Sequence, residues 1–177
     1  MWWHCIPSVI RMHCIISRRA QAVIEIELAH FPDTETGGLL LGRTAPGNDI
    51  SILEATDSGY QNTIHTPGSF QYDAAYEEHL CCFLSQLYQP PLQLIGVWHK
   101  HNSAHPNDSL PFSSADEKIH RQLMENSYPC VSVLFEKTSK SKDSIHYDTR
   151  IFLLSPNGKH RDITDVTVWG KDSFLAL

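Results

Sequence analysis

The chain has 177 residues, a length typical of one domain and sufficient to bury a core without a disulfide framework. Its formal net charge is −6 and its 14 Lys and Arg residues are scattered, which argues against the continuous basic surface of nucleic-acid-binding proteins. The five cysteines form no Cys-x-x-Cys pair, which argues against a four-thiolate zinc site and favours a reducing, cytoplasmic environment. No stretch approaches the roughly 20 apolar residues of a membrane span, and residues 1–17 do not match an export signal, so we expect no membrane partner.

The first half of the chain predicts one ambiguous element followed by two strands and a helix. Residues 23–28 alternate like a strand, but residues 17–30 have helical spacing, so both interpretations stay open. The glycine-bounded apolar run 37–42 and residues 50–56 predict two buried strands. Residues 73–89 carry apolar side chains at helical spacing, and the prolines that follow end this predicted helix.

The second half predicts strands at residues 92–101, 131–135 and 151–154, the last leading into a turn at 156–158. Between the first two, a helix should begin at Ser113 or Ser114 and run to about Asn126, because Ser114 and Glu117 match a capping box. The interleaved pattern predicts an α/β fold with one mixed sheet flanked by helices, formed by a single domain over residues 1–177.

Two histidines stand two residues apart near the end of the predicted strand 92–101. On a strand such residues face the same side, about 6.6 Å apart along the chain, so His99 and His101 can converge on one metal ion while Lys100 points away. Asp116, in the first turn of the next helix, adds a carboxylate. Two imidazoles and one carboxylate leave an open position for water on a tetrahedral ion, so we expect one Zn²⁺ per chain.

Together these residues resemble the motifs of the JAMM zinc isopeptidases, also called the MPN+ or JAB-domain family. That family has a glutamate at the start of a strand, then His-x-His-Pro, then Ser-x-x-Asp. Glu35 precedes the strand Gly-Gly-Leu-Leu-Leu-Gly, and Gly-Val-Trp-His-Lys-His contains the two histidines, most like bacterial members. Ser113 and Asp116 complete the pattern, and the resemblance extends over about residues 17–154.

The chain departs from the family pattern at two places. Asn102 stands where the family usually has proline, and the loop from His101 to Ser113 is four residues longer than usual. His105, followed by a proline at the customary distance from Ser113, is therefore an alternative ligand that could replace His101 or His99. We favour His99 and His101 because strand geometry brings them together without a special loop.

The resemblance implies a JAB/MPN domain, related in architecture to cytidine deaminases, that cleaves peptide or isopeptide bonds. Glu35 would act as general base and acid, and Ser113 would donate a hydrogen bond to the oxyanion. The substrate would be the C-terminal tail of a ubiquitin-like protein, within a bacterial conjugation or antiphage system that includes activating and conjugating enzymes.

Several other functions remain open from the sequence. The chain could be a metal-free MPN scaffold subunit, or a protease that trims a sulfur-carrier protein with the same chemistry. A non-haem iron oxygenase also uses two histidines and a carboxylate, but usually in another order. Zinc deaminases need a Pro-Cys-x-x-Cys element, and Cys130 has no second cysteine after it.

Overall fold

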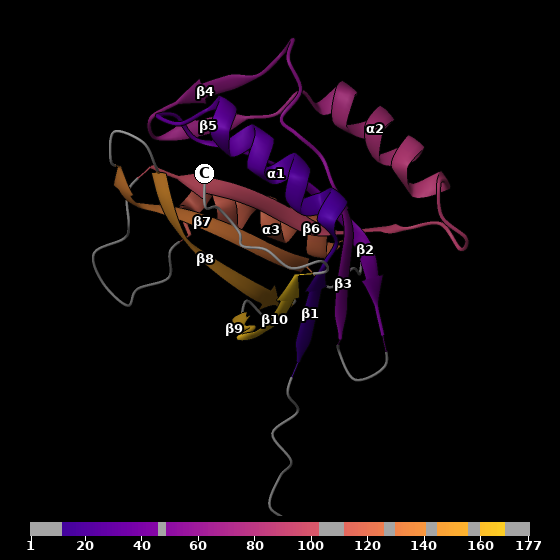
Figure 1. Cartoon of the computed structure of the whole chain (residues 1–177). Helices are drawn as coiled ribbons and strands as arrows, with labels where there is room; N and C mark the ends of the chain where they lie inside the picture. Colours follow the sequence, from indigo (N-terminus) through magenta and orange to yellow (C-terminus); the bar gives the residue numbers. More distant parts are fainter. Residues whose placement is uncertain are drawn as a thin grey trace, which may run out of the picture.

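The computed structural model describes residues 12–45, 49–102, 112–125, 130–140, 145–155 and 160–168. These residues form a single α/β domain, in which three helices pack on a strongly curled sheet of eight strands (Figure 1). The helices are α1 (Arg18–His30), α2 (Ala74–Gln86) and α3 (Ser114–Glu125). The strands are β1 (His13–Ile16), β2 (Thr36–Thr44), β3 (Ile50–Ala55), β4 (Ile64–Thr66), β5 (Ser69–Gln71), β6 (Gln93–His101), β7 (Cys130–Lys140), β8 (Ile145–Leu154), β9 (His160–Asp162) and β10 (Asp165–Val168).

The eight-stranded sheet has the order β10-β1-β3-β2-β6-β7-β8-β9, and β4 pairs only with β5 as a separate hairpin. Strand β1 pairs in parallel with β10 and β3, and β6 pairs in parallel with β7, whereas the other pairs are antiparallel. The predicted α/β class and mixed sheet are therefore confirmed.

The ambiguous segment near the N-terminus is the helix α1. Ser17 caps it by accepting a hydrogen bond from the Ala20 backbone N–H at 3.1 Å. Ala20, Ile24 and Leu28, spaced by four residues, are buried, whereas Ile26 is 69% exposed. The period-two pattern of residues 23–28 was thus misleading, because only one helical stripe enters the core.

The other predicted elements are confirmed, and some are longer than expected. Strands β7 and β8 extend well beyond the predicted residues 131–135 and 151–154, and α2 begins after its cap Asp73. The sequence did not predict β1, β4, β5, β9 or β10, which are only three or four residues long. The predicted turn at 156–158, the N-terminal residues 1–11 and His105 lie outside the described residues.

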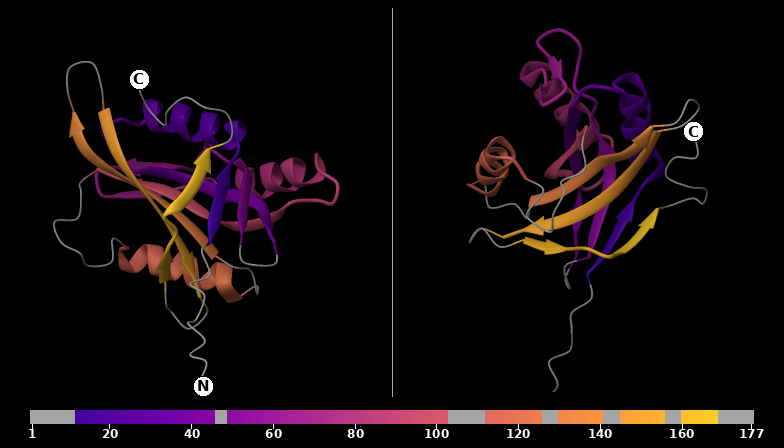
Figure 2. Two further views of the ribbon diagram at one scale, coloured as in Figure 1. Left: turned by 60° about the horizontal axis from the view of Figure 1, so that its bottom comes forward. Right: turned by 90° about the vertical axis from the view of Figure 1, so that its left-hand side faces the viewer.

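Helices α1 and α3 lie on opposite sides of the sheet (Figure 2). The main core forms between α1 and the sheet face that carries Trp98, Val133 and Phe135, all nearly inaccessible to solvent. A smaller cluster of Leu41, Leu84 and Leu92 packs α2 onto the sheet. Successive residues of β6 therefore face different layers: Trp98 and Lys100 face α1, and His99 and His101 face the side of α3.

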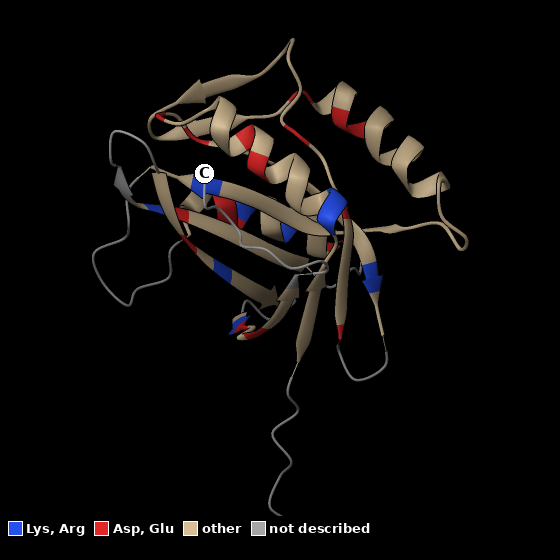
Figure 3. Cartoon of the chain, viewed as in Figure 1, with Lys and Arg blue, Asp and Glu red and all other residues tan. Residues whose placement is uncertain are grey.

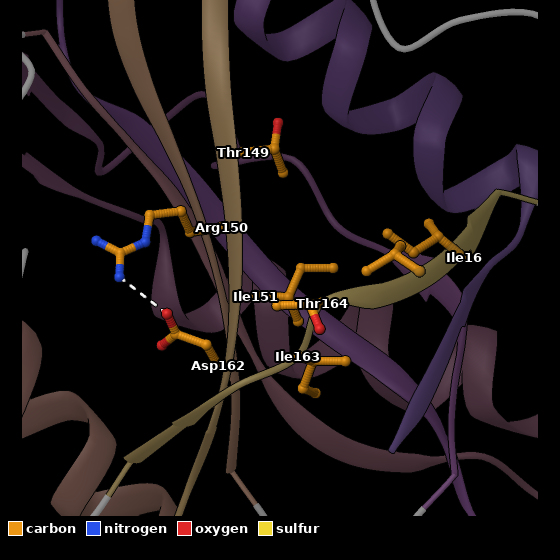
Figure 4. A pocket seen from close by; sticks show the side chains of 8 residues that line it. Ile16, Thr149, Arg150, Ile151, Asp162, Ile163 and Thr164 are labelled. Atoms are coloured by element: carbon orange, nitrogen blue, oxygen red, sulfur yellow. Dashed lines mark hydrogen bonds and ion pairs between the residues drawn. The ribbon is translucent and has the colours of Figure 1, made fainter. Parts of the chain in front are cut away.

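The curl of the sheet brings β8 close to β1 and β10. The chain passes directly from β9 to β10 through Ile163 and Thr164, and the Ile163 N–H donates to the Ile151 carbonyl at 2.8 Å. A cavity of about 550 Å³ lies beside this connection, and Figure 4 shows Arg150 paired with Asp162 at its wall and isoleucines on the other side. This cavity is lined by none of the predicted site residues.

Figure 3 shows Lys and Arg positions and Asp and Glu positions spread over several of the described elements. Among the described residues, no helix is both long and apolar enough to cross a membrane.

Candidate metal centre

The two histidines of β6 are buried side by side at the carboxyl end of the strand. Their Nε2 atoms lie 3.0 Å apart, and the exposed fractions of His99 and His101 are 3% and 6%. Both rings project to the side of α3 because alternate strand residues share a face. The predicted convergence of these imidazoles is therefore present.

Asp116 approaches the histidines from the first turn of α3. Its Oδ1 lies 3.5 Å from His99 Nε2 and its Oδ2 lies 3.6 Å from His101 Nε2. The chain runs from β6 through α3 to the parallel neighbour β7, so the start of α3 lies near the carboxyl end of β6. This crossover brings together residues that are distant in the sequence.

The donor set fits a metal ion. The three side chains each offer one ligand atom, and these atoms lie within 4.8 Å of one another. A tetrahedral zinc ion with bonds of about 2.0–2.1 Å holds its ligand atoms about 3.3 Å apart. The observed separations of 3.0, 3.5 and 3.6 Å are close to that value, so His99, His101 and Asp116 could hold a metal ion with little movement.

Burial and the Asp116 carboxylate set opposite protonation tendencies in the two histidines. Burial lowers the pKa of His99 to about 4. Burial also lowers the pKa of His101, but the hydrogen-bonding carboxylate of Asp116 outweighs it and the net shift is upward. Burial raises the pKa of Asp116, yet His101 and His99 hold it well below its usual range. Burial thus favours neutral His99, the Asp116 carboxylate favours the protonated form of His101, and a metal ion would compete with a proton for His101.

Glu35 lies at the entrance of β2, beside this centre. Glu35 directly precedes Thr36, the first residue of β2, which is paired with Lys100 between the two histidines of β6. Burial raises the pKa of the half-buried Glu35, the negative charge of Asp116 adds to the rise, and the positive charges of His101 and Lys100 oppose it. A carboxylate with a raised pKa next to a possible metal site is suited to proton transfer.

Gly37 leaves room for the histidine strand to approach β2. A Cβ atom at this position would lie 2.5 Å from the Trp98 carbonyl oxygen and 2.9 Å from His99 Cβ. Any larger residue would therefore push β2 away from β6 next to the metal centre.

Ser113 forms the cap of α3 together with Asp116. The Ser113 N–H donates to Asp116 Oδ2 at 2.7 Å, and the Asp116 N–H donates to Ser113 Oγ at 3.2 Å. The capping box is thus Ser113 with Asp116, and the predicted box of Ser114 with Glu117 was wrong by one residue. The Ser113 side chain also hydrogen-bonds to the Asp116 carboxylate, so this serine both caps α3 and contacts a candidate metal ligand.

Two aromatic residues and a third histidine near the centre were not predicted. Phe70 of β5 stacks on His99 with ring centroids 6.5 Å apart. His120, one turn after Asp116, is buried on α3 with its Nε2 3.2 Å from Ser132 Oγ, and burial lowers its pKa to about 4. A cavity of about 10 Å³, enough for one water, lies among Phe70, Tyr72, His99, Asp116 and His120. The spacing of Asp116 and His120 was a usable signal, but the β4–β5 hairpin gave none.

Lys100 points away from the metal centre, as predicted, yet it is fully buried. Its Nζ donates to the Phe31 carbonyl at the end of α1. Burial and the neighbouring Lys137 lower the pKa of Lys100 to about 8, while Asp33 and Glu35 oppose this shift. The ammonium group thus lies on the face of β6 opposite the metal centre, although Lys100 stands between the two candidate ligands in the sequence.

Comparison with models of known protein families gave no match, and comparison with curated protein sequences gave none either.

Proposed function

We propose that this chain is a zinc-dependent peptidase or isopeptidase with a JAB/MPN-type domain, which cleaves the bond that follows the C-terminus of a ubiquitin-like protein. The observation that carries the proposal is the buried triangle of His99, His101 and Asp116, with Glu35 just before β2 and near enough for the charges of His101 and Asp116 to act on its pKa. The resemblance of the sequence motifs to JAMM isopeptidases supplies the reaction class. The α/β fold with a mixed sheet is compatible with that resemblance.

Each side chain has a defined role in the proposed reaction. Zinc held by the triangle would supply Lewis acidity, which activates water and polarises a carbonyl group near neutral pH. Glu35 accepts the proton of the attacking water and delivers it to the leaving amine, a role typically worth about 10²–10⁴ in rate. Ser113 donates its hydroxyl hydrogen to the developing oxyanion, and losing one such donor typically costs about 3–4 kcal/mol of transition-state stabilisation.

The β4–β5 hairpin supports an extended substrate in this proposal. It lies beside the site, because Phe70 of β5 stacks on His99 and the Glu35 N–H donates to Thr66 of β4 at 2.8 Å. A short, partly exposed two-stranded hairpin next to the reacting groups suits the addition of an extended C-terminal tail as a further strand. The partners would be the ubiquitin-like protein, its conjugates and the bacterial activating and conjugating enzymes that make them, in the cytoplasm.

Metal content and one substitution test the proposal. The purified chain, after incubation with zinc and gel filtration, should retain one zinc per chain by elemental analysis. Hydrolysis is measured on the aminomethylcoumarin amides of ubiquitin and of a bacterial sulfur-carrier protein. Glu35→Gln should keep the zinc and lower kcat about 10²–10⁴-fold, because only the proton acceptor is removed.

Glu25→Gln on α1 serves as a matched control, because this partly buried glutamate lies on a different element from the metal centre. Absence of zinc would favour the scaffold interpretation. Cleavage of the sulfur-carrier amide but not of the ubiquitin amide would identify a sulfur-carrier protein as the substrate. Unchanged turnover by the Glu35 variant would contradict the mechanism.

A further inference from the structure

We propose that Lys100, Asn102 and Lys137 are positioning residues that clamp the 31–35 segment to the end of β6 and so hold Glu35 at the metal centre. The inference rests on the proposed function for the importance of Glu35. The clamp itself is a property of the fold, so it can be tested without metal or substrate.

The lysines hold the segment from the side of α1. The Lys100 Nζ donates to the Phe31 carbonyl, and Lys137, on the neighbouring strand β7, donates to the Pro32 carbonyl and to Asp33 Oδ1, both at 2.9 Å. Phe31 is the cap residue at the carboxyl end of α1, where backbone carbonyls lack helical partners and carry partial negative charge. Lys100 therefore satisfies the carbonyl at the end of the helix, and Lys137 satisfies the carbonyl of the residue after it.

Asn102 joins the same segment to the β4–β5 hairpin. Its Nδ2 donates one hydrogen to the Asp33 carbonyl at 3.1 Å and the other to the Pro67 carbonyl at 2.9 Å. A primary amide is well suited to this bridge because it has two hydrogens on one nitrogen. The residue that replaces the proline of the JAMM pattern therefore has a specific structural role in this chain.

The hairpin in turn fixes both backbone polar groups of Glu35. The Glu35 N–H donates to the Thr66 carbonyl at 2.8 Å, and the Glu35 carbonyl lies 3.0 Å from His65 Nδ1. Since β2 begins only at Thr36, Glu35 stands outside the sheet and depends on these contacts for its position. Thr66 and His65 thus complete the connection from Asn102 to Glu35.

The donors of these hydrogen bonds lie next to the candidate metal ligand His101. Lys100 and Asn102 each adjoin His101 in the sequence, and Lys137 follows Glu136, which is paired with His101 in the β6–β7 register. The strand that carries the candidate metal ligands therefore also fixes the candidate base. Proton transfer needs hydrogen-bonding distance, and a displacement of about 1 Å can cost up to about 10²-fold in rate.

Asn102→Asp tests the clamp with little change of shape. The carboxylate cannot donate, so both bridging hydrogen bonds are lost. The matched control is Gln71→Glu, which makes the same amide-to-carboxylate change at an exposed position of the same hairpin. Lys137→Met is a second, independent variant, with Lys118→Met on the exposed side of α3 as its control and Lys137→Arg as the conservative rescue.

The first measurement is hydrogen exchange of the Glu35 amide in metal-free protein, followed by NMR. We expect exchange to be at least about 10-fold faster in Asn102→Asp and Lys137→Met, because the segment that presents this amide to Thr66 is released. In these two variants, amides in the middle of α1 should exchange at wild-type rates. In Gln71→Glu, Lys118→Met and Lys137→Arg, the Glu35 amide itself should exchange at close to the wild-type rate. Unchanged exchange at Glu35 in both variants would overturn the clamp.

The second measurement is steady-state hydrolysis of the aminomethylcoumarin amides by zinc-loaded protein. We expect about 10- to 100-fold lower kcat in Asn102→Asp and Lys137→Met, with KM and zinc content within about twofold of wild type and with partial recovery in Lys137→Arg. Faster exchange with unchanged kcat would show a merely structural anchor and overturn the positioning role. If the wild-type protein hydrolyses neither amide, the proposed function falls, and the exchange result alone then supports or overturns the clamp.

Discussion

Glu77 is an acidic residue placed where its charge is unfavourable. Its side chain is 1% exposed on the inner face of α2, and Thr56 Oγ1 donates to its Oε1 at 2.7 Å. Burial raises its pKa to about 8, the Thr56 hydrogen bond opposes this shift, and the nearby carboxylates of Asp57, Glu27 and Asp73 add to it. The residue is therefore largely protonated in the folded protein at neutral pH.

This pKa predicts a pH-dependent loss of stability that Glu77→Gln removes. Below about pH 4.5 the carboxyl is protonated in both states; between there and about pH 8 only the unfolded chain loses the proton. The folded state thus loses up to about 1.4 kcal/mol per pH unit as pH rises over this interval. Urea unfolding at pH 5, 6, 7 and 8 measures the free energy of unfolding of both proteins. The difference between Glu77→Gln and wild type should shift in favour of the variant with each increase in pH.

Glu78→Gln is the control for this experiment, because Glu78 is the exposed neighbour of Glu77 on the same helix. It should leave the pH dependence of the free energy of unfolding as in wild type. Parallel curves for Glu77→Gln and wild type would contradict a protonated Glu77.

The metal ligands and the residues around them differ in how far the sequence could predict them. His99, His101 and Asp116 follow from strand periodicity and a helix start, both of which are local patterns. Lys100 and Asn102 carry no such signal, because their partners lie in the 31–35 segment and the β4–β5 hairpin. Their roles depend on which segments meet in space.

At the scale of elements, the N-terminus of α3 combines two functions in one serine. Ser113 caps the helix through Asp116 and is also the proposed oxyanion donor. Ser113→Ala and Ser113→Gly separate these roles, since alanine at a helix cap costs about 1 kcal/mol and glycine only a few tenths. If the hydroxyl stabilises the oxyanion, both variants should lower kcat about 10²–10³-fold, whereas only the alanine variant loses measurable stability.

The readouts are the kcat of the zinc-loaded variants and their free energies of unfolding in urea. Ser114→Ala, at the exposed first residue of α3, is the control. Near-normal turnover of Ser113→Gly would contradict the role of Ser113 as oxyanion donor and would support only its role as the helix cap.

Elements with a long buried face were predictable, and short or exposed ones were not. Strands β2, β3 and β6 are apolar runs with clear boundaries, and α2 ends before consecutive prolines. Strands β9 and β10 are short and have mostly exposed side chains, so no local periodicity marks them, and β10 pairs with β1 at the other end of the described chain. The α1 segment was ambiguous for another reason. Its apolar residues fit both the strand period of two and the helical period of 3.6, and only packing against the sheet selects the helix.

At the scale of the whole molecule, metal binding should stabilise the fold. The candidate ligands come from β6 and α3, which converge only in the folded chain, so zinc binds the native state preferentially. Zinc at about 100 times its Kd should add about 2.7 kcal/mol, which corresponds to a rise of roughly 5–10 °C in Tm for a protein of this size. A chelator should reverse the rise, measured by thermal unfolding followed by circular dichroism.

His99→Ala and His101→Ala should abolish this response, and His79→Ala, at an exposed position on α2, should preserve it. A zinc response that survives in both ligand variants would place the ion elsewhere.

The pairing of β1 with β10 joins the beginning and the end of the described chain. Because β1 is synthesised long before β10, a nascent chain that has reached β9 already contains β2, β6 and α3, and hence every candidate metal ligand. In such a chain the outer edge of β1 has no strand beside it, and an uncovered edge is a template for pairing with another molecule. Ribosome stalling or C-terminal proteolysis should therefore yield a species that retains metal affinity but self-associates through β1.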